Sequence, residues 1–251
     1  MVSKIKHKEV PFGYKNVTVS DKLKLVENLF NDIAPKYDLM NDIMSLLLHR
    51  AWKQKMLNNL NLKTNPICLD LAGGTGDIAI KIVNSYPNAT VYNCDLSNKM
   101  ILHGKKRAWN SGITNSIEWV CGDGALLPFT NNKFDLVTIA FGLRNCAKLE
   151  ETVIEMSRVL KPGGRFFCLE FSPTSDLKIQ PFYDFYSFKI IPILGKIFAN
   201  NANAYKYLVE SIRRFPPPET IEKMMCNAGI KSIKTKKFLG GIAYLYSGWA
   251  I

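Results

Sequence analysis

The chain has 251 residues, 47% of them apolar, enough for one well-buried α/β domain with an insertion or extension rather than two independent domains. Its net charge of +12 would suit an anionic partner, but the lysines are scattered in a way that is typical of a solvated surface. Six cysteines without a C-x-x-C pair predict free thiols, three isolated histidines predict no metal site, and no run approaches the roughly 18 apolar residues of a membrane span.

The amino-terminal region is predicted to be helical. Residues 1–8 are rich in lysine but lack the apolar segment of a secretion signal. Apolar residues at helical spacing predict one helix over 21–30 and a second from about Asn41 to Leu60. Within the second helix a polar stripe recurs every four residues and faces either a pocket or water: Asn41, Ser45 and His49. We expect these helices to cover the site formed by the next motif.

That motif is a nucleotide-binding loop. An apolar run, Ile67–Leu71, ends in the glycine-rich turn Ala72–Gly76, and a helical pattern follows. Glycines let a ligand approach the backbone, and the helix start offers free N–H groups. A second strand, 90–94, ends in Asp95, about 20 residues on, where a carboxylate can reach ribose hydroxyls. The alternatives are a G-x-G-x-x-A loop of a nicotinamide enzyme, and a structural turn without a ligand.

Further predicted strands bring more polar residues to the edge of the sheet at which the glycine-rich turn and Asp95 lie. Ser97 is predicted to cap a helix that ends at Gly112, and the strand Ile117–Cys121 leads to Asp123, which either accepts from an adenine amino group or is only a turn residue. The strand 134–141 runs directly into Arg144 and Asn145, where active-site residues are expected. Four cysteines in these runs are predicted to be buried: Cys68, Cys94, Cys121 and Cys168.

The rest of the chain first interrupts the alternation of predicted strands and helices and then completes it. A helix over 149–160 and a strand over 165–171 are followed by the aromatic, apolar segment 173–201, which is expected to pack as core or to form a lipophilic lid or membrane-facing surface. Helices over 205–214 and 219–227 come next. Two strands, 230–238 and 242–249, are predicted to form an antiparallel hairpin around Gly240 and Gly241.

Several motifs resemble those of the UbiE-type ubiquinone/menaquinone C-methyltransferases, and the resemblance extends over nearly the whole chain from Phe12. The segment 70–76 is similar to motif I of S-adenosylmethionine (SAM) methyltransferases. The segments 37–52 and 158–172 resemble the two family signatures, and 141–145 and 210–213 are also similar. In two departures, Leu46–Leu48 replaces a segment that often carries glycine, and Ala140 stands where some members have a hydroxyl residue.

The resemblance implies an α/β fold with a Rossmann-like, seven-stranded class I methyltransferase sheet. It further implies a helical amino-terminal cover over 1–62, a SAM-binding domain over 63–251, and a helical, substrate-side insertion over 173–214 between strands 5 and 6. The activity that it implies is C-methylation of a polyprenylated benzoquinol, of the 2-methoxy-6-polyprenyl-1,4-benzoquinol type, or of demethylmenaquinol, with SAM as methyl donor.

The resemblance also implies residue roles. Arg144 would stabilise a phenolate, Asn145 would orient a water or hydroxyl, and Tyr37 would complete the hydrogen-bond chain. Spacing alone would make Arg144 a loop salt bridge. SAM-binding residues are Asp70, Gly73, Gly74, Thr75, Gly76, Asp95, Leu96, Asp123, Gly124 and Ala140. Candidates for the substrate pocket are His49, Glu170, Tyr205 and Arg213.

Three other functions stay open. An NAD-binding oxidoreductase rests on G-x-G-x-x-A alone, and an RNA methyltransferase rests on the charge of +12, without an aromatic-interleaved basic track. A catalytically silent SAM-binding subunit of a quinone-biosynthesis assembly fits the same motifs. The expected partners are a polyprenylated quinol and a membrane surface or biosynthetic complex, with no nucleic acid and a homodimer left open. The expected location is the cytoplasmic face of the inner membrane, or the mitochondrial matrix in a eukaryote.

Overall fold

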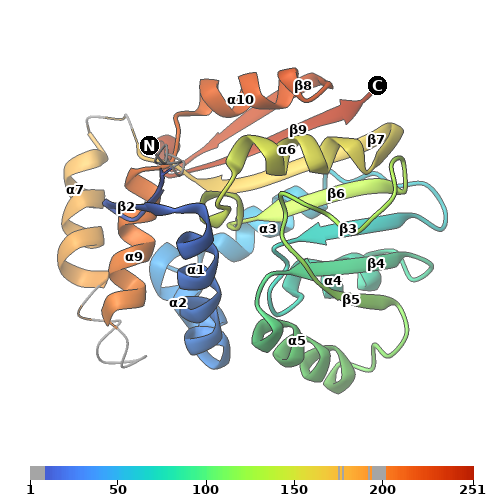
Figure 1. The fold of residues 1–251 in the computed structure, drawn as a ribbon, viewed down its shortest axis with the longest axis horizontal. Helices are drawn as coiled ribbons and strands as arrows, with labels where there is room; N and C mark the ends of the chain where they lie inside the picture. Colours follow the sequence, from blue (N-terminus) through green and yellow to red (C-terminus); the bar gives the residue numbers. More distant parts are fainter. Residues whose placement is uncertain (1–8, 175, 177, 192, 194–201) are drawn as a thin grey trace, which may run out of the picture.

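A seven-stranded sheet forms the centre of the computed structural model, which describes residues 9–174, 176, 178–191, 193 and 202–251 (Figure 1). The strand order is β5-β4-β3-β6-β7-β9-β8, and β9 runs antiparallel to both of its neighbours. This confirms the predicted sheet and its final hairpin. The strands are β3 Ile67–Leu71, β4 Thr90–Asp95, β5 Ile117–Cys121, β6 Phe134–Ala140, β7 Leu160–Phe171, β8 Ile230–Phe238 and β9 Ala243–Ala250.

Helices cover both faces of the sheet, and the central strands therefore have continuous apolar sequences. The helices α6 Leu149–Arg158 and α10 Pro218–Asn227 pack on one face, and α4 Asp77–Ser85 and α5 Asn98–Asn110 lie on the other (Figure 1). The Ser97 hydroxyl accepts from the Met100 N–H and caps α5 as predicted. Cys68, Cys94 and Cys168 are buried, but the prediction for Cys121 is wrong, because β5 is an edge strand and leaves it exposed.

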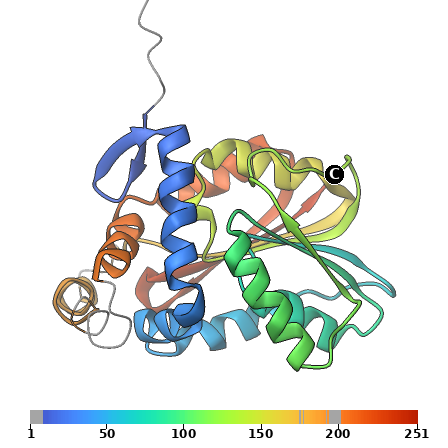
Figure 2. The same ribbon diagram turned by 60° about the horizontal axis from the view of Figure 1, so that its bottom comes forward.

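The amino-terminal region begins with a β-hairpin that the helical patterns did not predict. Strands β1 Glu9–Phe12 and β2 Lys15–Thr18 precede α1 Val19–Ile33. The hairpin packs against α9 Ala202–Arg213. The Phe12 ring stacks on the Tyr207 ring with their centroids 4.3 Å apart, and the Tyr14 N–H donates to the Glu210 carboxylate at 3.1 Å. Figure 2 shows α1 crossing in front of the sheet with the hairpin at one end of it.

The prediction of one helix over 41–60 is wrong. The chain forms α2 Tyr37–Ser45 and α3 Leu48–Leu57, separated by Leu46 and Leu47, whose φ angles of 49° and 68° are left-handed. The predicted polar stripe does not face water, because Asn41, Ser45 and His49 are all buried. The Ser45 hydroxyl donates to the Asn41 carbonyl and accepts from the His49 N–H, so it joins the two helices.

The described part of the predicted insertion, 173–214, is helical and includes α9. Helix α7 Gln180–Phe185 continues into the π-helical turn η3 Tyr186–Ile190, and both figures place α7 beside α9. The Tyr186 hydroxyl donates to the Ile43 carbonyl at 2.5 Å, which ties the insertion to α2. Of the predicted segment 173–201, residues 175, 177, 192 and 194–201 lie outside the described residues, as does the lysine-rich start, 1–8. Within the described part of the chain, every helix is too short or too polar to cross a membrane.

Candidate active site

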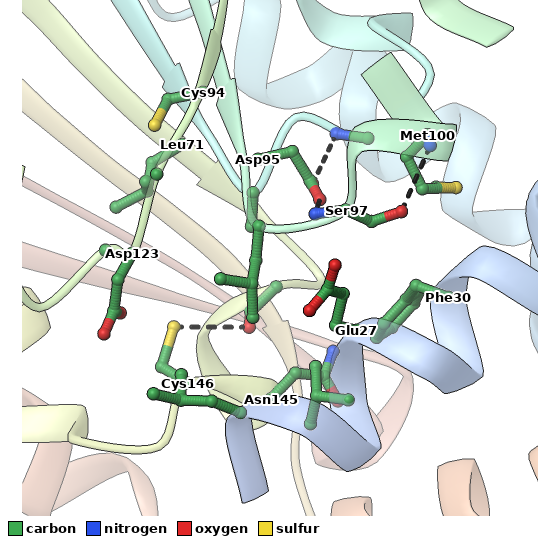
Figure 3. Close-up of a pocket in the computed structure, with 18 of the residues that line it drawn as sticks. Glu27, Phe30, Leu71, Cys94, Asp95, Ser97, Met100, Asp123, Asn145 and Cys146 are labelled. Atoms are coloured by element: carbon green, nitrogen blue, oxygen red, sulfur yellow. Dashed lines mark hydrogen bonds between the residues drawn. The ribbon is translucent and has the colours of Figure 1, made fainter. Parts of the chain in front are cut away.

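A cleft opens at the carboxyl ends of β3, β4 and β6, beneath α1. The sheet order reverses here, since β3 lies between β4 and β6, and such a switch point is where doubly wound sheets bind nucleotides. The space in and in front of the cleft, open solvent included, is about 670 Å³. It is lined by α1, by the turn after β3, and by the segments after β4, β5 and β6 (Figure 3).

The turn after β3 leaves no room for side chains at its glycines. Gly74 and Gly76 have φ angles of +54° and +75°, which favour glycine. A Cβ at Gly74 would lie 2.8 Å from the Met100 methyl carbon, and one at Gly76 would lie 2.6 Å from the Trp119 ring. A Cβ at Gly73 would lie 2.1 Å from the Asn93 side-chain oxygen. The predicted glycine loop is therefore a close-fitting turn at the start of α4.

Asp95 joins the end of β4 to this turn. Its Oδ2 accepts from the Gly74 N–H at 2.9 Å, and its Oδ1 accepts from the Ser97 N–H at 2.8 Å. Burial raises the pKa of Asp95 to about 6, although the hydrogen bonds from backbone N–H groups oppose this shift. Asp123 lines the same cleft, and its Oδ1 accepts from the Ala125 N–H at 3.0 Å. Two carboxyl groups thus face a space that can hold hydroxyl and amino donors.

Asp70 lies beneath the loop rather than in the cleft. Its Oδ1 accepts from the Thr138 hydroxyl at 2.9 Å, and the side chain is buried. Burial raises the pKa of Asp70 to about 7. Asp70 lies next to Gly73 of the turn, where an added Cβ would be 2.8 Å from the Asp70 Oδ2.

Arg144 and Asn145 form a buried network in the 3₁₀ turn η2 Leu143–Asn145. One terminal nitrogen of Arg144 donates to Glu170 and to the Phe141 carbonyl, both at 2.6 Å. Asn145 lines the cleft, and its side-chain oxygen accepts from the Tyr207 hydroxyl at 3.1 Å. The salt bridge that spacing suggested for Arg144 exists, but it is buried rather than solvated. Such a pair costs desolvation energy and is weak evidence for a purely stabilising role.

An ion-pair network ties the amino-terminal helices to the glycine loop. The Lys53 ammonium contacts Asp77 at 2.8 Å, and Arg107 joins Asp77 at 3.4 Å to Asp38 of α2 at 2.7 Å. Arg107 also donates to the Thr75 hydroxyl at 3.4 Å. Burial is the largest single effect and lowers the pKa of Lys53, but Asp77, Tyr37 and Asp38 together outweigh burial, so the pKa of Lys53 is raised. Neither Lys53 nor Arg107 belonged to a motif, so sequence reasoning missed both.

The structure gathers only part of the predicted site at the cleft. The predicted residues that line it are Tyr37, Gly74, Asp95, Leu96, Asp123, Gly124 and Asn145. The predicted residues that do not line it are Asp70, Ala140, Arg144, His49, Glu170, Tyr205 and Arg213, together with Gly73, Thr75 and Gly76, which belong to the same turn as Gly74. Tyr205 is buried in the core, and Arg213 pairs with Asp184 and lies over the Tyr183 ring.

The helix predicted over 21–30 was expected to cover the site, and α1 lines the cleft, but the sequence did not indicate which of its residues do so. Glu27 and Phe30 line the cleft, and Figure 3 shows the Glu27 carboxylate pointing from α1 towards the loop that carries Asp95 and Ser97. Met100 and Phe141 also line it. The helical periodicity of α1 identified its apolar face, but no local signal singled out Glu27 and Phe30 as residues that reach the cleft.

The sheet order, the glycine turn and the paired carboxyl groups define a class I SAM-dependent methyltransferase. The chain matches the family described as the ubiE/COQ5 methyltransferase family over residues 16–250 and belongs to it. SAM is its methyl donor. The cleft fits SAM because a ligand can come close to the backbone of the glycine turn, and because the carboxyl groups of the cleft can accept hydrogen bonds from hydroxyl and amino groups. The oxidoreductase alternative is not supported.

Two relatives illustrate the family. The ubiquinone/menaquinone biosynthesis C-methyltransferase UbiE of Dinoroseobacter shibae is 43% identical over 244 residues, which cover 97% of this chain and 98% of that protein. The mitochondrial 2-methoxy-6-polyprenyl-1,4-benzoquinol methylase of Dictyostelium discoideum is 39% identical, over 98% of this chain and 87% of that protein.

Solved structures share the fold at low sequence identity. A putative methyltransferase of Haloferax volcanii, in complex with the Trm112 activator, matches with a TM-score of 0.65 at 15% identity, covering 88% of this chain and 97% of that chain. A SAM-dependent methyltransferase of Aquifex aeolicus matches with a TM-score of 0.54 at 17% identity, covering 79% and 89%.

Proposed function

We propose that this enzyme transfers the SAM methyl group to a ring carbon of a polyprenylated benzoquinol, of the 2-methoxy-6-polyprenyl-1,4-benzoquinol type, or of demethylmenaquinol. The family and the names of the two relatives support this acceptor class. The observation that carries the proposal is Arg144: its Nε is buried and has no hydrogen-bond partner among the described residues, although one terminal nitrogen of the guanidinium donates to Glu170. A buried, free N–H on a permanent cation suits a phenolate oxygen.

The cofactor contacts follow from the cleft. Asp95 accepts from the ribose hydroxyls, Asp123 and Gly124 hold the adenine, and the glycine turn with Thr75 holds the methionine end. The cover predicted over 1–62 is described from residue 9 onward, and α1, α2 and α3 support its role because Phe30 and Tyr37 line the cleft and Lys53 contacts Asp77.

The chain's residues prepare the acceptor ring carbon for nucleophilic attack on the methyl group of the donor. Arg144 stabilises the negative charge that develops on a ring oxygen. Tyr207 holds the Asn145 amide through its hydroxyl, so Asn145 is oriented for a water or a ring hydroxyl. Tyr37 stays protonated, because burial raises its pKa despite the nearby Lys53 and Arg144, and it therefore acts as a donor.

We also propose a surface at which the enzyme takes up its acceptor. Three aromatic rings at three-residue spacing are exposed on α7 and η3: Phe182, Phe185 and Phe188. Lys178 and Lys189 are exposed beside them, and the chain carries a net charge of +12. This surface, the α7 face, contacts an anionic membrane that holds the polyprenylated substrate. A protein partner in a quinone-biosynthesis assembly is the competing occupant.

Removal of the chain from its host tests the proposal. The expected result is accumulation of a quinone precursor that lacks one ring methyl group, detected by mass spectrometry, with the mature quinone restored by the wild-type chain. The precursor also identifies the ring as benzoquinone or naphthoquinone. An unchanged quinone profile would contradict the proposal.

A further inference from the structure

Helix α1 presents one acidic side chain to the cleft. Its other three residues that line the cleft are apolar and lie on the same helical face: Leu23, Val26 and Phe30. The acidic residue is Glu27, which is half-buried and makes no hydrogen bond or ion pair with any residue that the structure describes. The inward face of an amphipathic helix is normally apolar, so a carboxylate on this face calls for a partner inside the cleft.

Hydrogen bonds on both sides of Glu27 hold α1 across the cleft. Near the start of α1, the buried Lys22 ammonium donates to the Cys146 carbonyl, which follows the η2 turn, at 2.9 Å. One turn after Glu27, Asn31 Oδ1 accepts from the hydroxyl of Ser97, in the loop after β4, at 2.7 Å. The position of Glu27 is therefore set relative to both edges of the cleft.

The Glu27 carboxylate lies on the same side of the cleft as Asp95. Figure 3 shows it pointing from α1 towards the loop that carries Asp95 and Ser97. The pKa of the Cys121 thiol, at the end of β5, is raised by partial burial, by Asp95 and by Glu27, so both carboxylates lie near this strand end. Glu27 and Asp95 thus approach one part of the cleft from α1 and from the end of β4.

Asp95 has less capacity to accept hydrogen bonds than Glu27. Each carboxylate oxygen of Asp95 already accepts one backbone N–H, from Gly74 and from Ser97. Both oxygens of Glu27 are without such a donor, and an ionised carboxylate only accepts. A ribose brings two hydroxyl donors to this part of the cleft, which gives Glu27 the partner that α1 does not provide.

We infer that Glu27 is a second ribose-binding residue of the SAM site and shares the ribose hydroxyls with Asp95. This inference rests on the ribose site proposed at Asp95, and it does not depend on the acceptor. It gives the amino-terminal cover a direct contact with the cofactor, because α1 then binds the ribose as well as enclosing it.

The Glu27→Ala variant tests this role, because alanine favours the helix and removes the carboxylate. In calorimetry at pH 8, we expect the Kd values for SAM and for S-adenosylhomocysteine to rise by the same factor of at least tenfold, as for loss of a hydrogen bond to a charged group. The 2′,3′-dideoxy analogue of S-adenosylhomocysteine has no ribose hydroxyls, so the wild type and the variant should bind it equally. Glu27→Gln, which keeps an accepting oxygen, should show an intermediate loss.

The matched control is Asp32→Ala, which removes the same charge from an exposed position of α1 and should leave all three Kd values unchanged. Three results would overturn the role of Glu27. They are wild-type affinity in Glu27→Ala, a loss that persists with the dideoxy analogue, or a larger loss for SAM than for S-adenosylhomocysteine, since Glu27 would then act only on the sulfonium charge.

The same titrations separate this inference from the proposals on which it rests. Lost affinity in Asp95→Ala together with wild-type affinity in Glu27→Ala would keep the ribose site and exclude Glu27 from it. A wild-type chain that binds the dideoxy analogue as tightly as S-adenosylhomocysteine would overturn the ribose site and the role of Glu27 together. The assay contains no quinol, so a failure of quinol methylation would not alter any of these results.

Discussion

The Asp95 carboxyl is predicted to make SAM binding depend on pH. Burial raises its pKa to about 6, and the ionised form is the better acceptor for ribose hydroxyls. Because protonation then competes with SAM, the Kd should be constant above about pH 7 and should increase by up to tenfold per unit as pH falls below 6. Isothermal calorimetry between pH 5 and 8 measures this dependence.

The control for this prediction is Asp95→Asn, which retains an accepting oxygen but cannot ionise. Its SAM affinity should be lower than that of the wild type at pH 8 and should not change with pH. Asp95→Ala should bind SAM still more weakly. A wild-type Kd that is the same at pH 5 and pH 8 would remove Asp95 from the ribose site.

Arg144 and Glu170 are predicted to be coupled in stability but not in catalysis. Arg144→Met leaves the Glu170 carboxylate buried without its guanidinium, which costs about 3–5 kcal/mol of unfolding free energy. The double variant Arg144→Met, Glu170→Met removes both charges, so most of that stability should return. Methyl transfer should stay lost in both variants, while SAM binding persists in the double variant. Denaturant unfolding and a methyl-transfer assay separate the two effects.

This pair of variants decides the role of Arg144. A double variant that regains stability and also methyl transfer would show that the guanidinium only balances Glu170. Loss of activity in the single variant alone would decide nothing, because an unfolded protein is also inactive.

At the level of elements, the junction between α2 and α3 stores backbone strain. Leu47 has a φ of 68° and is 58% exposed, so its side chain contributes little packing to offset the left-handed conformation. Leu47→Gly should therefore raise the free energy of unfolding by about 1 kcal/mol. The matched control is Leu102→Gly, at a similarly exposed leucine inside α5, which should lower it by about 1 kcal/mol. A destabilised Leu47→Gly variant would contradict this account of the junction.

The sequence predicted elements well where local chemistry determines them. The strand Ile117–Cys121 and the Ser97 cap of α5 have the predicted bounds and contacts, because an apolar run and a capping hydroxyl act locally. The break at Leu46 was not predicted, since two leucines carry no turn signal. The amino-terminal hairpin depends on the distant residues Tyr207 and Glu210, which no local pattern can indicate.

The residues of the cleft were likewise predictable only where local sequence patterns determine their positions. The glycine turn, Asp95 and Asp123 follow strands of recognisable pattern, so the edge of the sheet brings them together. Glu27 and Phe30 reach the cleft only because α1 folds across the sheet. The enclosure of Arg144 by Glu170 also depends on the pairing of β6 with β7, which the spacing of the residues does not reveal.

For the whole molecule, the α7 face is predicted to control binding to anionic membranes. The double variant Phe182→Ser, Phe185→Ser should bind vesicles that contain an anionic phospholipid at least tenfold more weakly in a sedimentation assay, because each phenylalanine loses about 1.5–3 kcal/mol of burial when fully inserted. The control is Trp109→Ser on α5, since Trp109 is 70% exposed and Phe182 is 74% exposed. Figures 1 and 2 place α5 far from α7.

Membrane binding on the α7 face also predicts a salt dependence, because the exposed lysines lie beside the aromatic rings. Binding that is unaffected by the phenylalanine changes, or that is equally lost in Trp109→Ser, would mean that the α7 face does not dock on the membrane.

The central claim is that this enzyme methylates a ring carbon of a prenylated quinol. The most direct measurement incubates the purified wild-type chain with methyl-labelled SAM and a short-tailed, demethylated quinol kept reduced, and locates the label by mass spectrometry and NMR. The account predicts one labelled methyl group on a ring carbon and release of S-adenosylhomocysteine in equal amount. A label on oxygen, or no transfer from a protein that binds SAM, would contradict it.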